Sequence, residues 1–191
     1  LEIGVYHLYM SKFDGVATKD LLAYIKHGTD DRIYAIAELL RRNVSLEEIG
    51  EKTQINNFFL RKLRNIIDEE REIKNNPLDI ETLFDAKKTG FSDKEIAKLW
   101  KKTEIEVFNL RKRENIFPVY KMIDTCSSEF NSYVPYFYST YEEENESIVS
   151  NKKKILVLGS GPIRIGQGVE FDYSTVHAVK TIKAAGYEAI I

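Results

Sequence analysis

The residues best suited to chemistry lie in a glycine-rich stretch close to the C-terminus. It begins Gly159-Ser160-Gly161-Pro162 and continues to Gly166-Gln167-Gly168. Glycines that follow a strand allow a tight turn and let backbone N–H groups approach a phosphate. The spacing differs from the G-x-G-x-x-G fingerprint of dinucleotide sites, however, and Pro162 removes one N–H donor. The residues by themselves therefore favour a structural glycine-rich turn over a dinucleotide site.

The elements that would position this loop are a strand before it and a helix after it. Ile155 to Leu158 form a short apolar run of the kind found in buried parallel strands. Ser174 or Thr175 can open a helix that ends at Gly186, and the residues from Tyr187 to Ile191 can form a second strand. The pattern predicts a single Rossmann-like βαβ unit.

Other reactive side chains form no recognisable site. His7, His27 and His177 lie far apart and do not have the spacing of metal ligands. The single cysteine, Cys126, can form no internal disulfide and has no base near it in the sequence, so we interpret it as a buried structural thiol.

The first two thirds of the chain predict short helices that follow one another as far as about Ile116. Thr29 or Asp30 can cap one whose apolar positions are spaced as on a helix face. A repeat lies within this part. The segment from Ser45 to Ile49 resembles that from Ser92 to Ile96 at an offset of 47 residues, each with a Ser cap and a Glu three positions on. Further on, residues between Thr53 and Ile66 match residues between Thr103 and Ile116 at an offset of 50. The two offsets predict three extra residues, Lys98-Leu99-Trp100, in the second copy.

Two alternatives of other classes remain open at this point. The second repeat could be the helix-turn-helix of a DNA-binding regulator. Its segment from Phe91 to Ala97 would then precede a basic recognition helix that contains Arg111-Lys112-Arg113. Against it, acidic residues are interleaved and the formal net charge is −2. The other alternative is a stand-alone nucleotide-binding domain built on the βαβ unit.

The composition and the ends of the chain limit the remaining classes. A chain of 191 residues with 43% hydrophobic residues can build a core, and no apolar run reaches the roughly 18 residues that span a bilayer. We therefore expect a cytoplasmic protein without membrane or nucleic-acid partners. The chain begins without Met and ends inside an apolar run, from which we expect an excised fragment. A stretch rich in Tyr and Phe and an acidic segment precede Ser150, where we place a domain boundary between residues 1–150 and 151–191.

These residues resemble one family closely. The segment from Gly159 to Tyr173 is similar to the opening of the second synthetase half of the carbamoyl phosphate synthetase large subunit. The upstream segments that match those preceding it in that family are Pro118-Val119-Tyr120-Lys121, Asp124-Thr125-Cys126, Glu129-Phe130 and Tyr138 to Glu144. Leu1-Glu2-Ile3-Gly4 resembles the end of the first half.

The resemblance implies a mainly α chain: a helical oligomerisation domain, followed by the start of the α/β pre-ATP-grasp domain. It implies an ATP-dependent carbon–nitrogen ligase of arginine and pyrimidine biosynthesis, which uses Mg or Mn and ammonia from a glutamine-amidotransferase small subunit. Both ATP-grasp modules lie outside this sequence, so we expect the chain alone to be inactive, to bind no cofactor or metal, and to serve self-association and linkage to the rest of the large subunit. By resemblance, Gly168 and Glu170 line the internal carbamate tunnel, with Ile163 and Arg164 close by.

Overall fold

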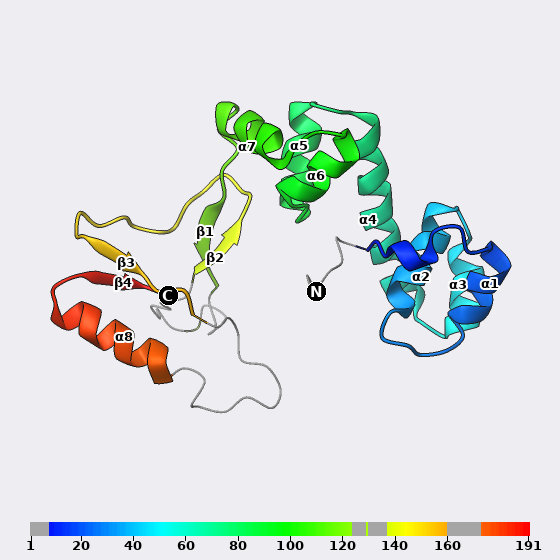
Figure 1. Cartoon of the computed structure of the whole chain (residues 1–191), viewed down its shortest axis with the longest axis horizontal. Helices are drawn as coiled ribbons and strands as arrows, with labels where there is room; N and C mark the ends of the chain where they lie inside the picture. Colours follow the sequence, from blue (N-terminus) through cyan, green and yellow to red (C-terminus); the bar gives the residue numbers. More distant parts are fainter. Residues whose placement is uncertain (1–7, 124–128, 130–136, 160–172) are drawn as a thin grey trace. The chain divides into compact units, whose positions relative to one another are not determined.

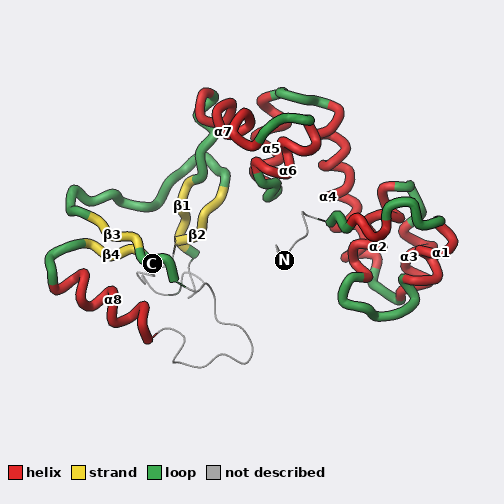
Figure 2. The backbone as a smooth tube through the Cα atoms, in the orientation of Figure 1, coloured by secondary structure: helices red, strands yellow, loops and turns green. Residues whose placement is uncertain are grey.

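The computed structural model describes residues 8–123, 129, 137–159 and 173–191 of this chain. The chain divides into two compact units, Leu1–Glu146 and Ser147–Ile191. Helices dominate the first unit, and the described strands form two small two-stranded sheets (Figures 1 and 2). The predicted fold class, mainly α with a small α/β part, is confirmed.

The first unit is a succession of helices. After a short 3-10 turn, η1 (Ser11–Phe13), it contains α1 (Thr18–Tyr24), α2 (Arg32–Arg41), α3 (Leu46–Thr53), α4 (Asn57–Asn75), α5 (Ile80–Lys88), α6 (Asp93–Trp100) and α7 (Glu104–Arg113). The expected cap of α2 is wrong: its N-cap is Asp31 rather than Thr29 or Asp30. The Asp31 carboxylate caps no backbone N–H, because it accepts hydrogen bonds from Lys12 and from the Tyr24 hydroxyl instead.

Serine caps begin the equivalent helices α3 and α6, as the sequence predicts. The hydroxyl oxygen of Ser45 accepts a hydrogen bond from the N–H of Glu48, and that of Ser92 accepts one from the N–H of Glu95, both at 3.1 Å. Each helix has eight residues and is followed by a C-cap residue with positive φ, Gln54 at 59° and Lys101 at 55°.

The predicted insertion in the second copy is wrong, because a constant offset of 47 residues relates the two copies. Asn56 caps α4 and Thr103 caps α7, so the helix and the loop before each cap have the same length in both copies. The sequence match at an offset of 50 paired residues with different roles. Thr53 is buried at the end of α3 and donates to the Ile49 carbonyl, whereas Thr103 starts α7 with a capping box.

The repeat also includes the helix before each Ser cap. Asn43 after α2 and Gly90 after α5 both have positive φ. The N–H of the next residue then donates to an equivalent carbonyl in each copy, Val44 to Leu39 at 3.0 Å and Phe91 to Ala86 at 2.8 Å. We call α2–α3–α4 repeat 1 and α5–α6–α7 repeat 2.

Each repeat has its own hydrophobic core, and α4 contributes to both. Leu60 and Ile67 belong to the core of repeat 1, while Ile73 belongs to that of repeat 2, and all three are fully buried. A helix of 19 residues is about 28 Å long, long enough to run from one core to the other. The long helix α4 thus joins the two repeats (Figure 1).

Four short strands complete the fold. β1 (Val119–Met122) pairs antiparallel with β2 (Phe137–Thr140), within the aromatic stretch for which the sequence predicted no strands. In the second unit, β3 (Lys154–Leu156) pairs parallel with β4 (Glu188–Ile190), and α8 (Tyr173–Ala184) lies between them in the chain. This order confirms the predicted strand–helix–strand unit. The helix is the crossover connection that two parallel neighbouring strands require.

Candidate interaction surface and the flanks of the glycine-rich loop

The predicted tunnel residues Ile163, Arg164, Gly168 and Glu170 lie outside the described residues. The structure describes what flanks them. Gly159 follows β3, and a Cβ built on it would lie 3.5 Å from the Ile191 side chain and 3.9 Å from that of Thr175. Gly159 therefore lies beyond the carboxyl end of the parallel strand β3, and functional loops of open α/β sheets lie at that edge.

Neither a metal centre nor a membrane span is found in the part of the chain that the structure describes. Within these residues, no group of three or more His, Cys, Asp or Glu side chains converges to hold an ion. Among the same residues, no helix combines the length and the apolar character needed to cross a bilayer.

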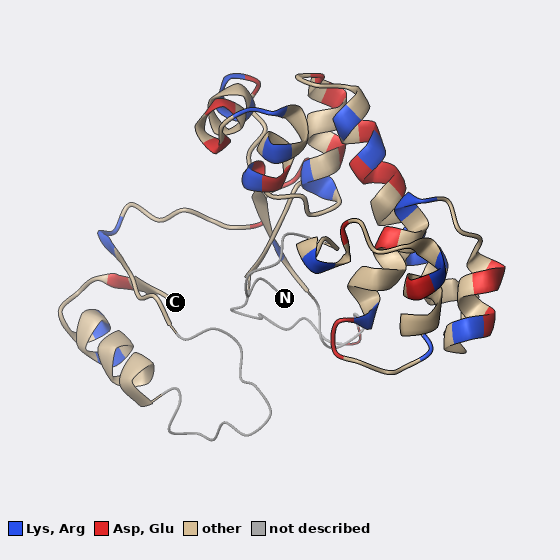
Figure 3. Ribbon diagram, turned by 45° about the vertical axis from the view of Figure 1, so that its right-hand side comes forward, with Lys and Arg blue, Asp and Glu red and all other residues tan. Residues whose placement is uncertain are grey.

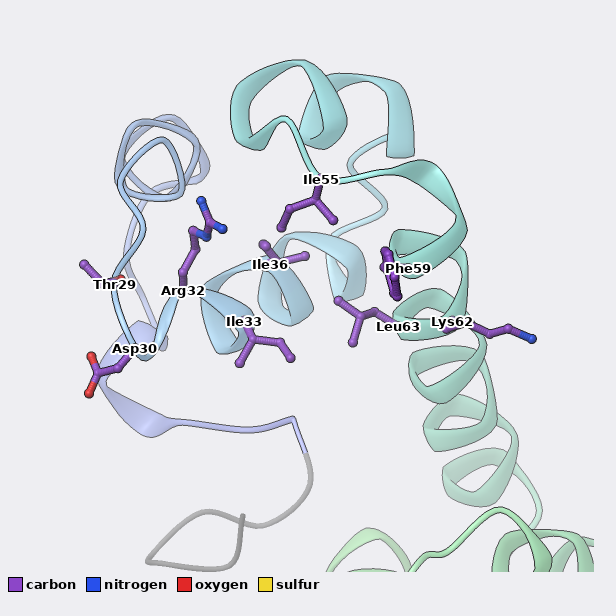
Figure 4. A pocket seen from close by; sticks show the side chains of 9 residues that line it. All are labelled: Thr29, Asp30, Arg32, Ile33, Ile36, Ile55, Phe59, Lys62 and Leu63. Carbon is purple, nitrogen blue, oxygen red and sulfur yellow. The ribbon is translucent and has the colours of Figure 1, made fainter. Parts of the chain in front are cut away.

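An apolar groove of about 370 Å³ lies in repeat 1, between α2 and the first turns of α4. Ile33, Ile36, Ile55 and Leu63 turn toward one another around it, and Phe59 forms a wall on the α4 side (Figure 4). Its rim carries charges of both signs, from Asp30, Arg32 and Lys62. The groove is thus a hydrophobic depression with a mixed polar edge.

Two exposed aromatic rings stand beside this groove at the start of α4. The side chains of Phe58 and Phe59 are 54% and 61% exposed, and their ring centroids lie 5.4 Å apart, edge to face. Lys62 lies over the Phe58 ring at 5.5 Å. From the sequence, Phe58 is one of the residues matched at an offset of 50, where it pairs with Phe108, and no exposed role is predicted for it. Adjacent helical residues point about 100° apart, so the pair Phe58-Phe59 is a signal that at least one ring lies away from the core.

A second candidate site is a largely buried network of charges in repeat 2. Asp93 at the start of α6 accepts hydrogen bonds from Arg111 of α7, at 2.8 Å from Nη2, and its other oxygen lies 2.9 Å from Lys87 Nζ of α5. The three side chains are 12%, 10% and 8% exposed. The cations also donate to backbone carbonyls, Lys87 to Phe91 and Arg111 to Ile116. The network thus joins all three helices of repeat 2.

The electrostatics of this network follow from its burial and its charges. Burial alone would raise the pKa of Asp93, but hydrogen bonds from Arg111 and Lys87, together with their charges, outweigh it and lower the pKa below its usual value. Tyr141, whose ring lies 5.3 Å from Lys87 Nζ and 5.9 Å from the Arg111 guanidinium, packs against the same core. Burial raises the pKa of the Tyr141 hydroxyl.

This network also bears on the DNA-binding alternative. Arg111, the first residue of the supposed recognition run, is buried and paired with Asp93, and Arg113 pairs with Glu114 at 2.8 Å. Acidic and basic residues are interleaved along the helices of the first unit (Figure 3). The described residues therefore give no support to a helix-turn-helix regulator, whose recognition helix needs free basic side chains.

Tyr9, which lies before the first helix, contacts both repeats. Arg41 of α2 forms a bidentate pair with Glu70 of α4, at 2.9 and 2.7 Å, and donates to the Leu8 carbonyl. The Tyr9 ring lies 5.8 Å from the Arg41 guanidinium and 4.1 Å from Nζ of Lys98 on α6. Tyr9 thus contacts a cation from each repeat.

We expect replacement of Glu95 by Met to stabilise the chain by about 1–3 kcal/mol at pH 7, because Glu95 is a poorly satisfied buried acid. Glu95 is only 4% exposed, and its Oε2 has no hydrogen-bond partner among the described residues. Burial raises its pKa, against the opposing charge of Lys98. A raised pKa favours the folded state in acid, and that contribution is lost as pH rises through the folded-state pKa.

The measurement is urea unfolding monitored by circular dichroism at several pH values. The gain should grow from acid to neutral pH. Glu48→Met, at the equivalent but exposed position of repeat 1, is the control and should change the unfolding free energy by less than about 0.5 kcal/mol. A destabilised E95M variant at pH 7 would contradict the assignment.

Two family models match this chain. The one described as the carbamoyl-phosphate synthetase large chain, oligomerisation domain, matches residues 1–115. The one described as the carbamoyl phosphate synthase preATP-grasp domain matches residues 151–191. The first match is more than half of the chain and contains α1 to α7, and the second contains β3, α8 and β4. The chain therefore belongs to the carbamoyl phosphate synthetase large-chain family.

Proposed function

We propose that this chain associates with copies of itself through its helical unit and links the two synthetase halves of the large subunit. The observation that carries this proposal is the match of residues 1–115 to an oligomerisation domain. The exposed rings of Phe58 and Phe59 beside an apolar groove support it, because exposed apolar surface of this kind is typical of protein contacts. The near balance of 28 basic and 30 acidic residues also suits protein partners better than nucleic acid.

The wider activity that we assign belongs to the whole enzyme. It is an ATP-dependent carbon–nitrogen ligase that makes carbamoyl phosphate for arginine and pyrimidine synthesis, in the cytoplasm, with a glutamine-amidotransferase small subunit. The residues described here offer no cluster of ligands for magnesium or manganese. By the resemblance to the family, we assign ATP and metal binding to the ATP-grasp modules of the large chain, and expect these 191 residues alone to have no synthetase activity.

For the glycine-rich loop we propose a passive role as part of a tunnel wall. Gly168 would allow a close backbone approach, and Glu170 could accept hydrogen bonds from the N–H groups of a carbamate-like intermediate. Ile163 and Arg164 would lie close to them. The position of Gly159 just beyond β3, which ends at Leu156, supports this role, since functional loops of open α/β sheets lie at the carboxyl ends of the strands. We keep the boundary of this domain at about residue 150.

Sedimentation velocity over a range of protein concentrations tests the proposed self-association. We expect the sedimentation coefficient to rise with concentration, because an interface of this kind follows mass action. A strictly monomeric profile at high concentration would contradict self-association of this chain.

Calorimetry with ATP tests the assignment of ATP binding to other parts of the large chain. We expect no binding in the micromolar range. Micromolar binding would show that the chain contains its own nucleotide site.

A further inference from the structure

The start of α4 presents a protruding ring and a hollow side by side. Phe58 is 54% exposed, and the groove lined by Ile33, Ile55, Phe59 and Leu63 lies beside it on the same repeat. We call these five residues the Phe58 surface. A surface with a knob next to a hole can pack on an identical surface turned by 180°, since each knob then meets the other copy's hole.

Repeat 2 shows that the fold does not require an apolar surface at this place. With the offset of 47 residues, Ile55 corresponds to Lys102 and Phe59 to Glu106. These two residues form an ion pair at 3.6 Å and both are exposed. The same helix triplet therefore folds with a polar pair where repeat 1 has two apolar side chains. Folding explains Ile55, which packs against the core of repeat 1. It does not explain the 61% exposed ring of Phe59, and an occupant of the groove does.

The charges at the rim favour a second copy of this chain as that occupant. Asp30 and Arg32 border the groove on the α2 side and Lys62 borders it on the α4 side. In a two-fold contact, the acidic part of one rim can face a basic part of the other, so that the surface complements itself in charge as well as in shape. The surface also lies within residues 1–115, which match the oligomerisation domain.

We propose that two copies of this chain meet through the Phe58 surface about a two-fold axis, with Phe58 of each copy seated in the groove of the other. The proposal rests on the self-association proposed above and adds the surface and its symmetry. Phe58 and Phe59 are the central aromatic residues of the contact, and the exposed rim supplies its polar edge. Central aromatic side chains dominate the binding energy of most interfaces.

The test transplants the polar pair of repeat 2 into repeat 1 of the full 191-residue chain. The double variant Ile55→Lys/Phe59→Glu should keep the far-ultraviolet circular dichroism of the parent, because repeat 2 folds with this pair. In sedimentation velocity we expect self-association at least about thirtyfold weaker, as for the loss of a central aromatic contact. Phe58→Glu should give the same result by removing the knob instead of the hole.

The matched control is Ile105→Glu, which changes the position of repeat 2 equivalent to Phe58 and is itself 60% exposed. It should associate as the parent does. A monomeric parent chain would overturn the proposed self-association and this surface together. A parent chain that associates while the Phe58 and Ile55/Phe59 variants associate equally well would overturn the surface alone. Equal disruption by Ile105→Glu would also overturn it, because the contact would then not be particular to repeat 1.

Discussion

Replacement of Asp93 by Asn is expected to lower the free energy of unfolding by about 3–5 kcal/mol, because it leaves two buried cations without their anion. Lys87 and Arg111 are 8% and 10% exposed and both contact the Asp93 carboxylate at 2.8–2.9 Å. Asparagine keeps the size of the side chain and loses its charge. The two cations would then repel each other inside repeat 2, with the neutral Asn amide oxygen and the backbone carbonyls of Phe91 and Ile116 as their acceptors.

Urea unfolding at pH 7, followed by circular dichroism, measures this loss. Asp68→Asn is the matched control, since Asp68 pairs with Arg71 in a contact where the two side chains are 54% and 37% exposed. An exposed pair of this kind contributes about 0–1 kcal/mol. Equal effects of the two substitutions would mean that the Asp93 network contributes no more than a surface ion pair.

The same network makes a contribution to stability that depends on pH. The folded-state pKa of Asp93 lies below its ordinary value, so the unfolded chain takes up the proton first as pH falls. The contribution is complete above the unfolded-state pKa of about 4 and is lost as pH falls through the lower folded-state pKa. The difference in stability between parent and D93N should therefore stay constant from pH 8 to pH 5 and shrink below about pH 4.

Replacement of Trp100 by Ala is expected to cost about 3–5 kcal/mol, the usual range for removal of a buried aromatic side chain. Trp100 ends α6 and is 5% exposed, within the core of repeat 2. Its indole N–H also donates to the Ile73 carbonyl of α4 at 2.7 Å. The substitution would leave a cavity between α6 and α4 and an unpartnered buried carbonyl.

Circular dichroism is the appropriate signal for this variant, because Trp100 is the single tryptophan of the chain. Trp100→Phe separates the two contributions, since it keeps an aromatic ring and removes the donor. Its expected cost is about 1–3 kcal/mol, from the unsatisfied Ile73 carbonyl and a smaller ring. A loss below 1 kcal/mol in W100A would mean that repeat 2 closes over the cavity.

Local sequence signals predicted much of the fold. The Ser caps at Ser45 and Ser92 follow from a short-range hydrogen bond between a side chain and the backbone three residues on, which no distant residue needs to support. The βαβ order around Gly159 follows equally from a strand, a glycine-rich turn and a helix. The error in the repeat has the opposite origin. Thr53 and Thr103 are identical residues, but packing made one a buried helix end and the other a cap.

The sequence by itself determined the family, the helical first part, and the loop in which Ile163, Arg164, Gly168 and Glu170 are proposed to act. Only the tertiary structure decided that Arg111 is buried against Asp93 instead of exposed for DNA, and that Phe58 and Phe59 lie beside a groove. Burial and charge pairing depend on how α2, α4, α5, α6 and α7 pack. The contact between Arg111 and Asp93, for example, joins residues 18 positions apart on different helices, and no local pattern encodes its geometry.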